Sequence, residues 1–245
     1  MFGDTSGRRI GEVWFEGPPG LPLLAKYLFT SKRLSIQNHP GAADAKARGL
    51  ASGKEECWLV LDAEPCATLG LGLRREVSRD ELRAAALDGS IVDLVDWRPV
   101  SAGDFYYVPA RTVHAIGAGI SLLEFQQNAD VTYRLYDYGR PRELHLDDSL
   151  AVAVLGPYRD GCARQVDAAI PAVLAAGPPF ALVQLVGQDG DMLEDRRRWV
   201  LPLGGRASAG GIEAGDGECL LVEPGPELLI EGRVLVGAEG AVSPA

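Results

Sequence analysis

The chain has 245 residues, enough for one large domain or two small ones. Hydrophobic residues make up 47% and charged residues 24%, which is typical of a globular chain with a buried core and excludes intrinsic disorder. The net charge of -10 argues against a general nucleic-acid-binding protein, so an anionic ligand would need a local cluster of Lys and Arg.

Cysteine usage and hydropathy predict a cytoplasmic protein. No C-x-x-C spacing occurs, so we expect buried free thiols in a reducing compartment rather than disulfides or a zinc ribbon; the cysteines are Cys57, Cys66, Cys162 and Cys219. The first fifteen residues contain no apolar core of a signal peptide, and no apolar run approaches the ~20 residues that span a bilayer. We therefore expect no membrane partner.

Taken in chain order, the predicted elements are mostly short strands. Helices are expected at 40–51, which is Ala-rich after a proline, and at 78–89, where Ser78 is the N-cap, Glu81 follows three residues later and Gly89 ends the helix. Apolar runs bounded by Gly, Pro or Asp predict strands at 57–63, 66–73, 104–110, 112–119, 121–127 and 131–138.

The second part of the chain predicts a further series of strands. "AVLAAGPPF" at 172–180 resembles a linker or crossover, and strands are expected at 181–187, 197–203, 218–225, 227–232 and 233–240. "AGDFYYVPA" at 102–110 is echoed by "AGDGECLLVEPG" at 214–225. We therefore predict an all-β fold of two related barrels in tandem with a few short helices.

The three histidines all lie within the first 150 residues, at His39, His114 and His145. We therefore predict a catalytic barrel at 1–150, and a smaller barrel without histidines at 151–245.

"GDFYYVPARTVH" matches the second half of the cupin signature. Gly103 is followed after five residues by Pro109, and His114 comes five residues later, on a strand that would turn it inward. The usual pattern has Gly two residues after the Pro, where a tight turn needs unusual backbone angles. Arg111 stands there, so we expect a changed turn.

Two other short stretches carry candidate metal ligands. In "LSIQNHPG", Gln37 and His39 are two residues apart, so they point to the same face of a strand. In "GKEECW", Glu56 opens a strongly apolar strand, where a carboxylate needs a partner or a metal. Two His and one Glu form a known catalytic zinc set. Taken singly, each has a structural alternative: a hydrogen-bonded core histidine, a structural amide, or an ion pair of Glu56 with Lys54.

These stretches, with "LLEFQQNADVTYRLYDYGR" and "RELHLDDSL", resemble the ordered blocks of type I mannose-6-phosphate isomerase, a cupin family, over about residues 10–150. The resemblance implies tandem cupin barrels and a zinc-dependent interconversion of mannose 6-phosphate and fructose 6-phosphate. It places one Zn²⁺ on four ligands, namely Gln37, His39, Glu56 and His114.

The resemblance also assigns groups around the metal. The active-site arginine falls on Arg134, the lysine of the lysine-x-glutamate motif on Lys54, and an aspartate on Asp130. Arg134 and Lys54 suit a phosphate. Asp130, Lys54 and His39 are the candidates for moving the proton between the two carbons, and Asp130 is our hypothesis, because a metal-bound histidine is a poor base.

Several positions depart from the family pattern. The N-terminal arm is short, Asn38 replaces a Val on the opposite face, Arg111 replaces the turn Gly, and Ala129 replaces a Ser. These changes affect the expected substrate more than the metal. Arg140 and Arg142 either add to a positive rim or pair with Asp147 and Asp148, and His145 is expected to be structural.

Two other functions remain open from the sequence. A non-catalytic cupin that binds a sugar or sugar phosphate need not keep Lys54, Asp130 and Arg134. A metal-dependent oxygenase usually has two His one residue apart followed by Glu, and "IQNHP" has Gln in the first position. The sequence is compatible with a monomer and with a homodimer.

Overall fold

The computed structural model describes residues 7, 9–187 and 191–242, and their strands form three sheets. The first has the order β1-β2-β9-β4-β7-β11, with β1 (Glu12–Trp14), β2 (Leu23–Thr30), β4 (Glu56–Ala63), β7 (Asp104–Val108), β9 (Ile120–Gln127) and β11 (Ala163–Gln165). The second has the order β10-β3-β8-β5-β6, with β3 (Ile36–Asn38), β5 (Thr68–Leu73), β6 (Val95–Pro99), β8 (His114–Ile116) and β10 (Tyr133–Tyr136).

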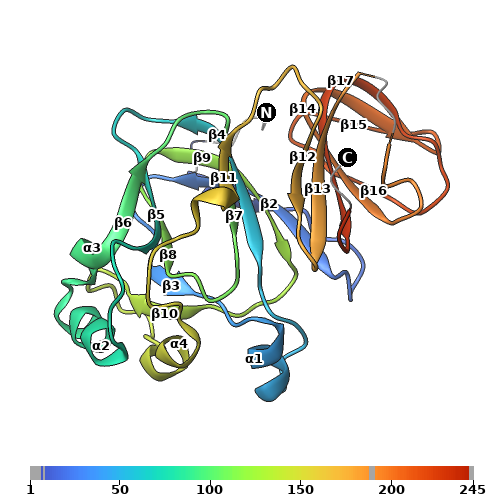
Figure 1. The fold of residues 1–245 in the computed structure, drawn as a ribbon. Coiled ribbons are helices and arrows are strands. Elements are labelled where there is room, and N and C mark those ends of the chain that lie inside the picture. The colour runs from blue at the N-terminus through green and yellow to red at the C-terminus, as the bar shows by residue number, and fades with distance from the viewer. Residues whose placement is uncertain (1–6, 8, 188–190, 243–245) are drawn as a thin grey trace. The chain divides into compact units, whose positions relative to one another are not determined.

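The third sheet contains the C-terminal strands (Figure 1). Its order is β12-β13-β17-β14-β15, with β16 also paired to β14; the strands are β12 (Ala172–Ala176), β13 (Phe180–Val186), β14 (Arg198–Ala209), β15 (Ile212–Gly215), β16 (Leu220–Val222) and β17 (Leu229–Glu239). The helices are α1 (Ala42–Ala47), α2 (Arg79–Asp88), α3 (Ile91–Leu94), α4 (Leu146–Val152) and the 3-10 turn η1 (Asp160–Cys162). The predicted all-β class with a few short helices is confirmed.

The chain separates into two compact units. One is Tyr27–Gln165, and the other joins the described residues of Met1–Lys26 to those of Val166–Ala245. Residues 163–165 form β11, which pairs with β7, so the first unit extends past the expected boundary at residue 150. The predicted division of labour, with the chemistry in the first part of the chain, stays a prediction.

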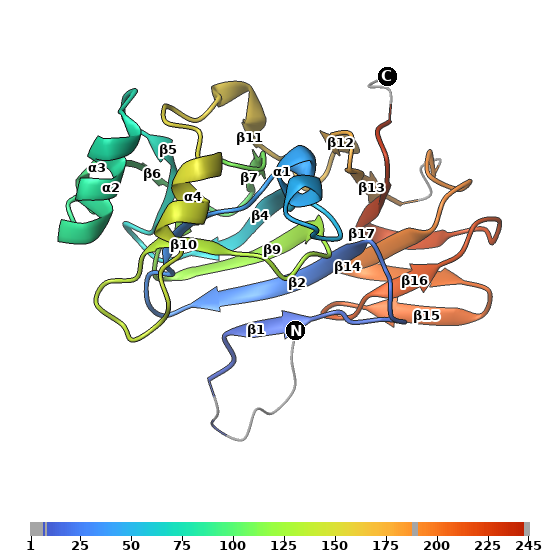
Figure 2. The same ribbon diagram turned by 90° about the horizontal axis from the view of Figure 1, so that it is seen from below.

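The second sheet has two different faces, and this difference explains the alternation along its strands. Its outward apolar side chains pack against helices in a core that contains Ile36, Ala115, Leu135 and residues of α2 and α4. Figures 1 and 2 show α2 and α3 side by side near α4. The opposite face packs against the first sheet in a second core, where Leu69, Leu71 and Ile116 meet Trp58, Val60, Tyr106 and Leu122. Polar side chains on this inner face therefore lie between two sheets.

The predicted helix at 78–89 is confirmed as α2. The Ser78 hydroxyl accepts a hydrogen bond from the amide of Glu81 at 3.1 Å, and Gly89 ends the helix with φ 87°. Glycine is suited to this left-handed position because it has no side chain to clash.

Two expectations for the C-terminal unit need correction. Residues 172–180 are not only a linker, because Ala172–Ala176 forms β12 and pairs with β13. The separate strands expected at 227–232 and 233–240 are one strand, β17, which passes through Gly232 at φ 78°. A side chain there would meet the carbonyl of Gly204 at 2.4 Å, so glycine lets the strand bend and continue.

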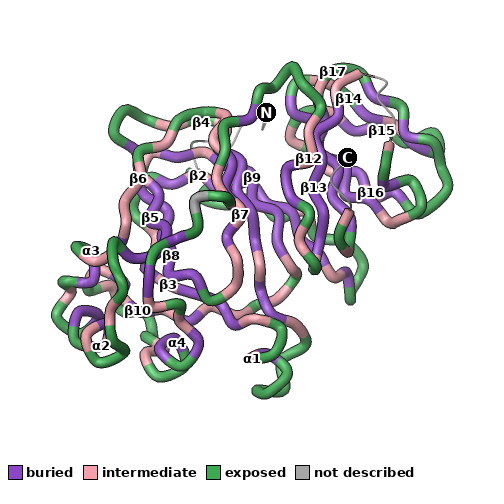
Figure 3. The backbone as a smooth tube through the Cα atoms, in the orientation of Figure 1, coloured by how far each residue is buried: buried purple, intermediate pink, exposed green. Residues whose placement is uncertain are grey.

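In Figure 3 much of the strand backbone is coloured as buried, whereas the helices also carry many exposed residues. Arg198 is a fully buried charge in the C-terminal unit. It forms an ion pair with Asp191 and donates to the carbonyls of Glu223 and Pro226 at 3.2 and 2.8 Å. Arg198 therefore links the loops that carry Asp191 and Glu223 to the first residue of β14. Over the described part of the chain, no helix is long and apolar enough to cross a membrane.

Candidate metal centre

Three candidate site residues form one row across the second sheet. Gln37 on β3 pairs in register with His114 on β8 and, on its other side, with Arg134 on β10. Residues directly opposite each other in antiparallel strands point to the same face. The row therefore faces the first sheet, while the neighbouring Ile36, Ala115 and Leu135 face the helices.

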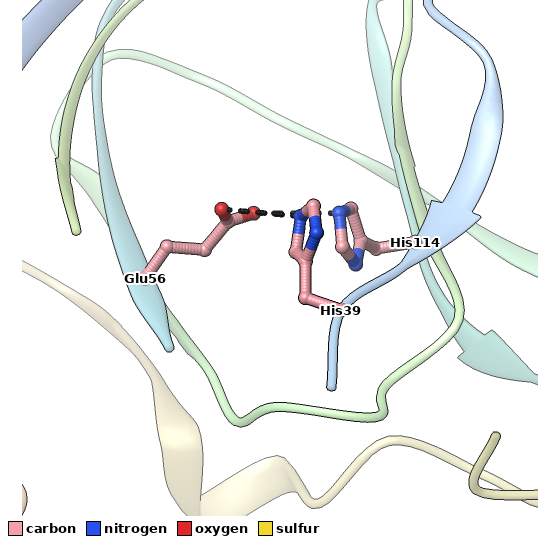
Figure 4. Close-up of side chains that lie close together, drawn as sticks. All are labelled: His39, Glu56 and His114. Atoms are coloured by element: carbon pink, nitrogen blue, oxygen red, sulfur yellow. Dashed lines mark ion pairs between the residues drawn. The ribbon is translucent and has the colours of Figure 1, made fainter. Parts of the chain in front are cut away.

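Glu56 meets the two imidazoles from the opposite sheet (Figure 4). Its Oε2 lies 3.4 Å from Nε2 of His39, and its Oε1 lies 3.3 Å from Nε2 of His114. All three side chains are buried, and their ligand atoms lie within 4.8 Å of one another. Segments far apart in the sequence thus bring two imidazole nitrogens and a carboxylate together in a water-poor space.

Backbone carbonyls orient both imidazoles. Nδ1 of His39 lies 2.8 Å from the carbonyl oxygen of Val131, and Nδ1 of His114 lies 2.9 Å from that of Thr112. A carbonyl oxygen only accepts, so each Nδ1 carries the proton and each Nε2 keeps its lone pair toward Glu56. Metal-binding histidines are commonly fixed by this arrangement.

Electrostatics keep the two imidazoles neutral. Burial, together with the nearby Lys54 ammonium, lowers the pKa of His39 from 6.5 to about 3. Burial also lowers the pKa of His114. For Glu56, burial alone would raise the pKa, but Lys54 and His39 hold it well below its ordinary value. Two neutral imidazoles and one carboxylate anion are the protonation states that a metal ion requires.

These residues fit a divalent metal. Nε2 of His39 is buried without a hydrogen bond, and Oε2 of Glu56 is buried with only the Lys54 ammonium beside it, so acceptor atoms face one another across the centre. A buried acceptor without a donor is costly, and a metal cation would bind the imidazole nitrogens and the carboxylate together. The donor set of two His and one Glu is typical of catalytic zinc sites that keep an open position.

Gln37, the fourth ligand implied by the family resemblance, turns its amide nitrogen toward the centre. Its Nε2 lies 3.4 Å from Nε2 of His114, and its Oε1 accepts from the Ser35 hydroxyl at 2.8 Å. Rotating the amide by half a turn would bring the oxygen to the centre. Ser35 suits both orientations, because a hydroxyl both donates and accepts.

Lys54 lies at the centre, with Nζ 3.2 Å from Oε2 of Glu56. The predicted alternative, an ion pair with Glu56, is therefore present in the structure. Gly53 makes this placement possible, because a side chain there would approach backbone atoms of Gly41 and Ala42 at 2.7 Å. The close approach also lets the Lys54 amide donate to the carbonyl of Pro40 at 3.0 Å. Gly53 was not among the predicted site residues.

Asp130 and Arg134 differ in their relation to the donor group. Asp130 is exposed in the loop after β9, one residue before the Val131 carbonyl that holds His39. Arg134 is half-buried, with Nη1 donating to the carbonyl of Glu143 at 3.4 Å and its Nε buried without a hydrogen bond. The structure thus places Arg134 on the inner face and Asp130 at the rim.

Arg111 does not change the turn in the way we expected. It adopts the left-handed conformation itself, with φ 72°, and its amide donates to the carbonyl of His39 at 2.7 Å. Its guanidinium binds both oxygens of Asp44, at 2.6 and 2.9 Å. Arg111 thus takes the left-handed backbone conformation that a glycine would take in this turn, and its charge is paired with Asp44 of α1.

Arg140 and Arg142 do not pair with Asp147 and Asp148. Both bind the buried carboxylate of Asp137, and together they hold its pKa below the ordinary value although burial alone would raise it. Asp147 pairs with Arg83, and Asp148 lies 3.7 Å from Arg48. The two arginines therefore hold the loop after β10 against the carboxylate of Asp137.

Two other predicted positions also have structural contacts. Asn38 is fully buried on the face opposite Gln37, where its amide donates to the Ser149 carbonyl at 3.1 Å and accepts from the Ser149 hydroxyl at 2.8 Å. His145 stands at the start of α4, and its Nδ1 accepts from the amide of Arg134 at 3.3 Å. Both contacts fix strands that carry inner-face residues.

Two inner-face residues of β9 were not among the predicted site residues. Glu124 and Gln126 are buried and pair in register with Trp58 and Glu56. Oε1 of Glu124 accepts from the Trp58 indole at 3.0 Å, and the Trp58 ring stands edge-on to His114, 5.5 Å between ring centres. Period-two alternation in "LLEFQQ" could have revealed them, since Glu124 and Gln126 share a face.

The chain is similar in sequence and in fold to known mannose-6-phosphate isomerases. No protein-family model matches the chain. It is 43% identical over 141 residues to mannose-6-phosphate isomerase of Streptococcus mutans, covering 55% of this chain and 44% of that relative. The chain spans about half the length of the curated relatives it matches.

Solved structures agree on the fold. The crystal structure of mannose 6-phosphate isomerase from Bacillus subtilis matches with a TM-score of 0.70 at 26% identity, covering 89% of this chain and 75% of that one. A structure described as zinc-bound mannose 6-phosphate isomerase shares the fold, with a TM-score of 0.56 at 16% identity over 90% and 79% of the two chains. The cupin fold is thus confirmed. The resemblance to type I mannose-6-phosphate isomerase, predicted from the sequence blocks, is confirmed as well.

Proposed function

We propose that the chain is a zinc-dependent aldose–ketose isomerase that interconverts mannose 6-phosphate and fructose 6-phosphate. The observation that carries this proposal is the buried group of His39, Glu56 and His114, whose two Nε2 lone pairs and carboxylate converge inside a barrel similar to that of the isomerases. A bound zinc ion would polarise an oxygen of the substrate.

The reaction needs a proton to move between two adjacent carbons. A base removes the proton from C2 of the open-chain aldose, the C1–C2 double bond of an enediol forms, and the C1 oxygen gains a proton. The base then delivers the proton that it took from C2 to C1, and the C2 hydroxyl gives up its own proton as the carbonyl forms at C2. The chain must therefore supply a base beside the two carbons and cations for the charged oxygens.

Lys54 and Arg134 are the proposed cations. Lys54 is 3.2 Å from Glu56, so it lies beside the reacting end of a sugar bound at the centre. Arg134 shares the inner face with Gln37, two strands from His114, and its guanidinium geometry suits a phosphate.

Asp130 remains our hypothesis for the group that moves the proton, and Glu124 is a second candidate. Asp130 lies at the rim of the site, whereas Glu124 is buried on the inner face, two residues from Gln126. Asp130→Asn should cut turnover and leave bound zinc unchanged. If Asp130→Asn turns over normally while Glu124→Gln is inactive with its zinc retained, the role belongs to Glu124.

The proposed function is tested on the purified full chain. Bound metal is measured by elemental analysis, and conversion of mannose 6-phosphate to fructose 6-phosphate is followed before and after chelation, then after zinc is restored. We expect about one zinc per chain and activity that follows the metal. Unchanged activity after complete removal would refute the metal-dependent reaction. Zinc with no turnover on any hexose phosphate would instead favour a cupin that only binds its sugar.

A further inference from the structure

A further buried acceptor accompanies those at the metal centre. Like Nε2 of His39, Oε1 of Gln126 is buried and makes no hydrogen bond. Gln126 is 2% exposed, so the orphaned oxygen is not simply solvated. A buried amide oxygen without a donor is rare in folded proteins and calls for an explanation.

The orientation of this amide is determined by its other end. Nε2 of Gln126 donates to the carbonyl oxygen of Gln127 at 2.9 Å. A carbonyl cannot donate, so exchanging the amide oxygen and nitrogen would place two acceptors against each other. The oxygen is therefore the free end of the side chain.

The strand register places this side chain on the face of the metal centre. Gln126 is directly opposite Glu56 in the pairing of β9 with β4. Directly opposite residues in antiparallel strands share a face, and Glu56 uses that face to reach both imidazoles. Gln127 belongs to the other face, and its Oε1 accepts from the amide of Glu55 at 3.0 Å.

We propose that Oε1 of Gln126 accepts a hydrogen bond from a hydroxyl group of the bound sugar phosphate, and so positions that hydroxyl beside the metal centre. This rests on the proposed function. A neutral amide oxygen is a weak ligand for a transition metal, and the centre already offers two imidazoles and a carboxylate. A polyhydroxylated ligand supplies the kind of donor that this oxygen lacks.

The test uses a hexitol 6-phosphate, an open-chain sugar alcohol with no carbonyl, which cannot isomerise. Its affinity for the zinc-loaded full chain is measured by calorimetry, with metal content determined in parallel. Gln126→Met keeps the length of the side chain and removes the acceptor, and we expect its affinity to fall roughly 3- to 10-fold with zinc unchanged. Gln127→Met, the matched change on the opposite face, should bind as the wild type does.

Deoxy analogues identify the hydroxyl. The difference between wild type and Gln126→Met should vanish for the 1-deoxy or the 2-deoxy hexitol 6-phosphate, because the analogue lacks the donor that Gln126 would accept. Equal affinity of wild type and Gln126→Met for the full ligand would overturn the inference, as would a loss of zinc without a change in sugar affinity. A wild-type chain that holds zinc but binds no hexitol phosphate would count against the proposed function itself.

Discussion

Acidification should destabilise the metal-free protein through His39. Its pKa in the folded chain is lowered from 6.5 to about 3 by burial and by the charge of Lys54. Between those pH values the unfolded chain binds a proton that the folded chain does not, so the free energy of unfolding falls as the pH falls. The stability linked to His39 is therefore present above pH 6.5 and is lost progressively toward pH 3.

The expected size follows from the same shift. Linkage gives a limiting slope of about 1.4 kcal/mol per pH unit, which integrates to about 2 kcal/mol between pH 6.5 and about pH 4.5. His39→Gln removes the titrating group, so its profile should be flatter by that amount even if its stability is lower at every pH.

Chelator-treated wild type and His39→Gln would be unfolded with urea at several pH values, with circular dichroism as the signal. The quantity compared is the change in unfolding free energy with pH, so an offset common to all pH values drops out. Parallel profiles for wild type and His39→Gln would refute the reasoning, because they would mean that the folded chain also protonates near pH 6.5.

Three further changes test other features. Arg111→Gly should be more stable than Arg111→Ala by about 1 kcal/mol, because both lose the ion pair with Asp44 and only glycine tolerates φ 72° freely; equal thermal midpoints would contradict the strain. Ser35→Ala should weaken zinc affinity about 10-fold in competition with a chelator, because it removes the group that orients Gln37; unchanged affinity would remove that role. Arg198→Met should lower the unfolding free energy of the C-terminal unit by about 3 kcal/mol, because it strands the carboxylate of Asp191. Hydrogen exchange on β13 and β17 would report that loss, and unaltered exchange would argue against it.

Sequence patterns predicted the strand face of some polar residues but not of all. Gln37 and Arg134 are marked by short motifs, and the two-residue period of a strand assigns each to a face without knowledge of its neighbours. The cap of α2 was predictable for the same reason, since Ser78 and Glu81 act within one turn. Features that depend only on residues close in sequence, such as strand alternation and helix capping, can be predicted from the sequence.

Partners that depend on register or loop packing were not predictable in this way. Nothing in "EFQQ" states that Gln126 lies opposite Glu56, because the pairing joins segments 70 residues apart. Asp137 gathers two arginines that could equally have met other acids in the sequence, and Arg111 adopts a backbone conformation that non-glycine residues rarely take.

The two carbonyls that hold the imidazoles have a consequence for mutation. The acceptors at Val131 and Thr112 belong to the main chain, so replacing either side chain does not delete them. Sequence drift at these two positions can therefore proceed without turning the histidine rings. An insertion or deletion in either loop would move the carbonyl away from the imidazole. The centre should therefore tolerate substitutions at these two positions better than changes in loop length.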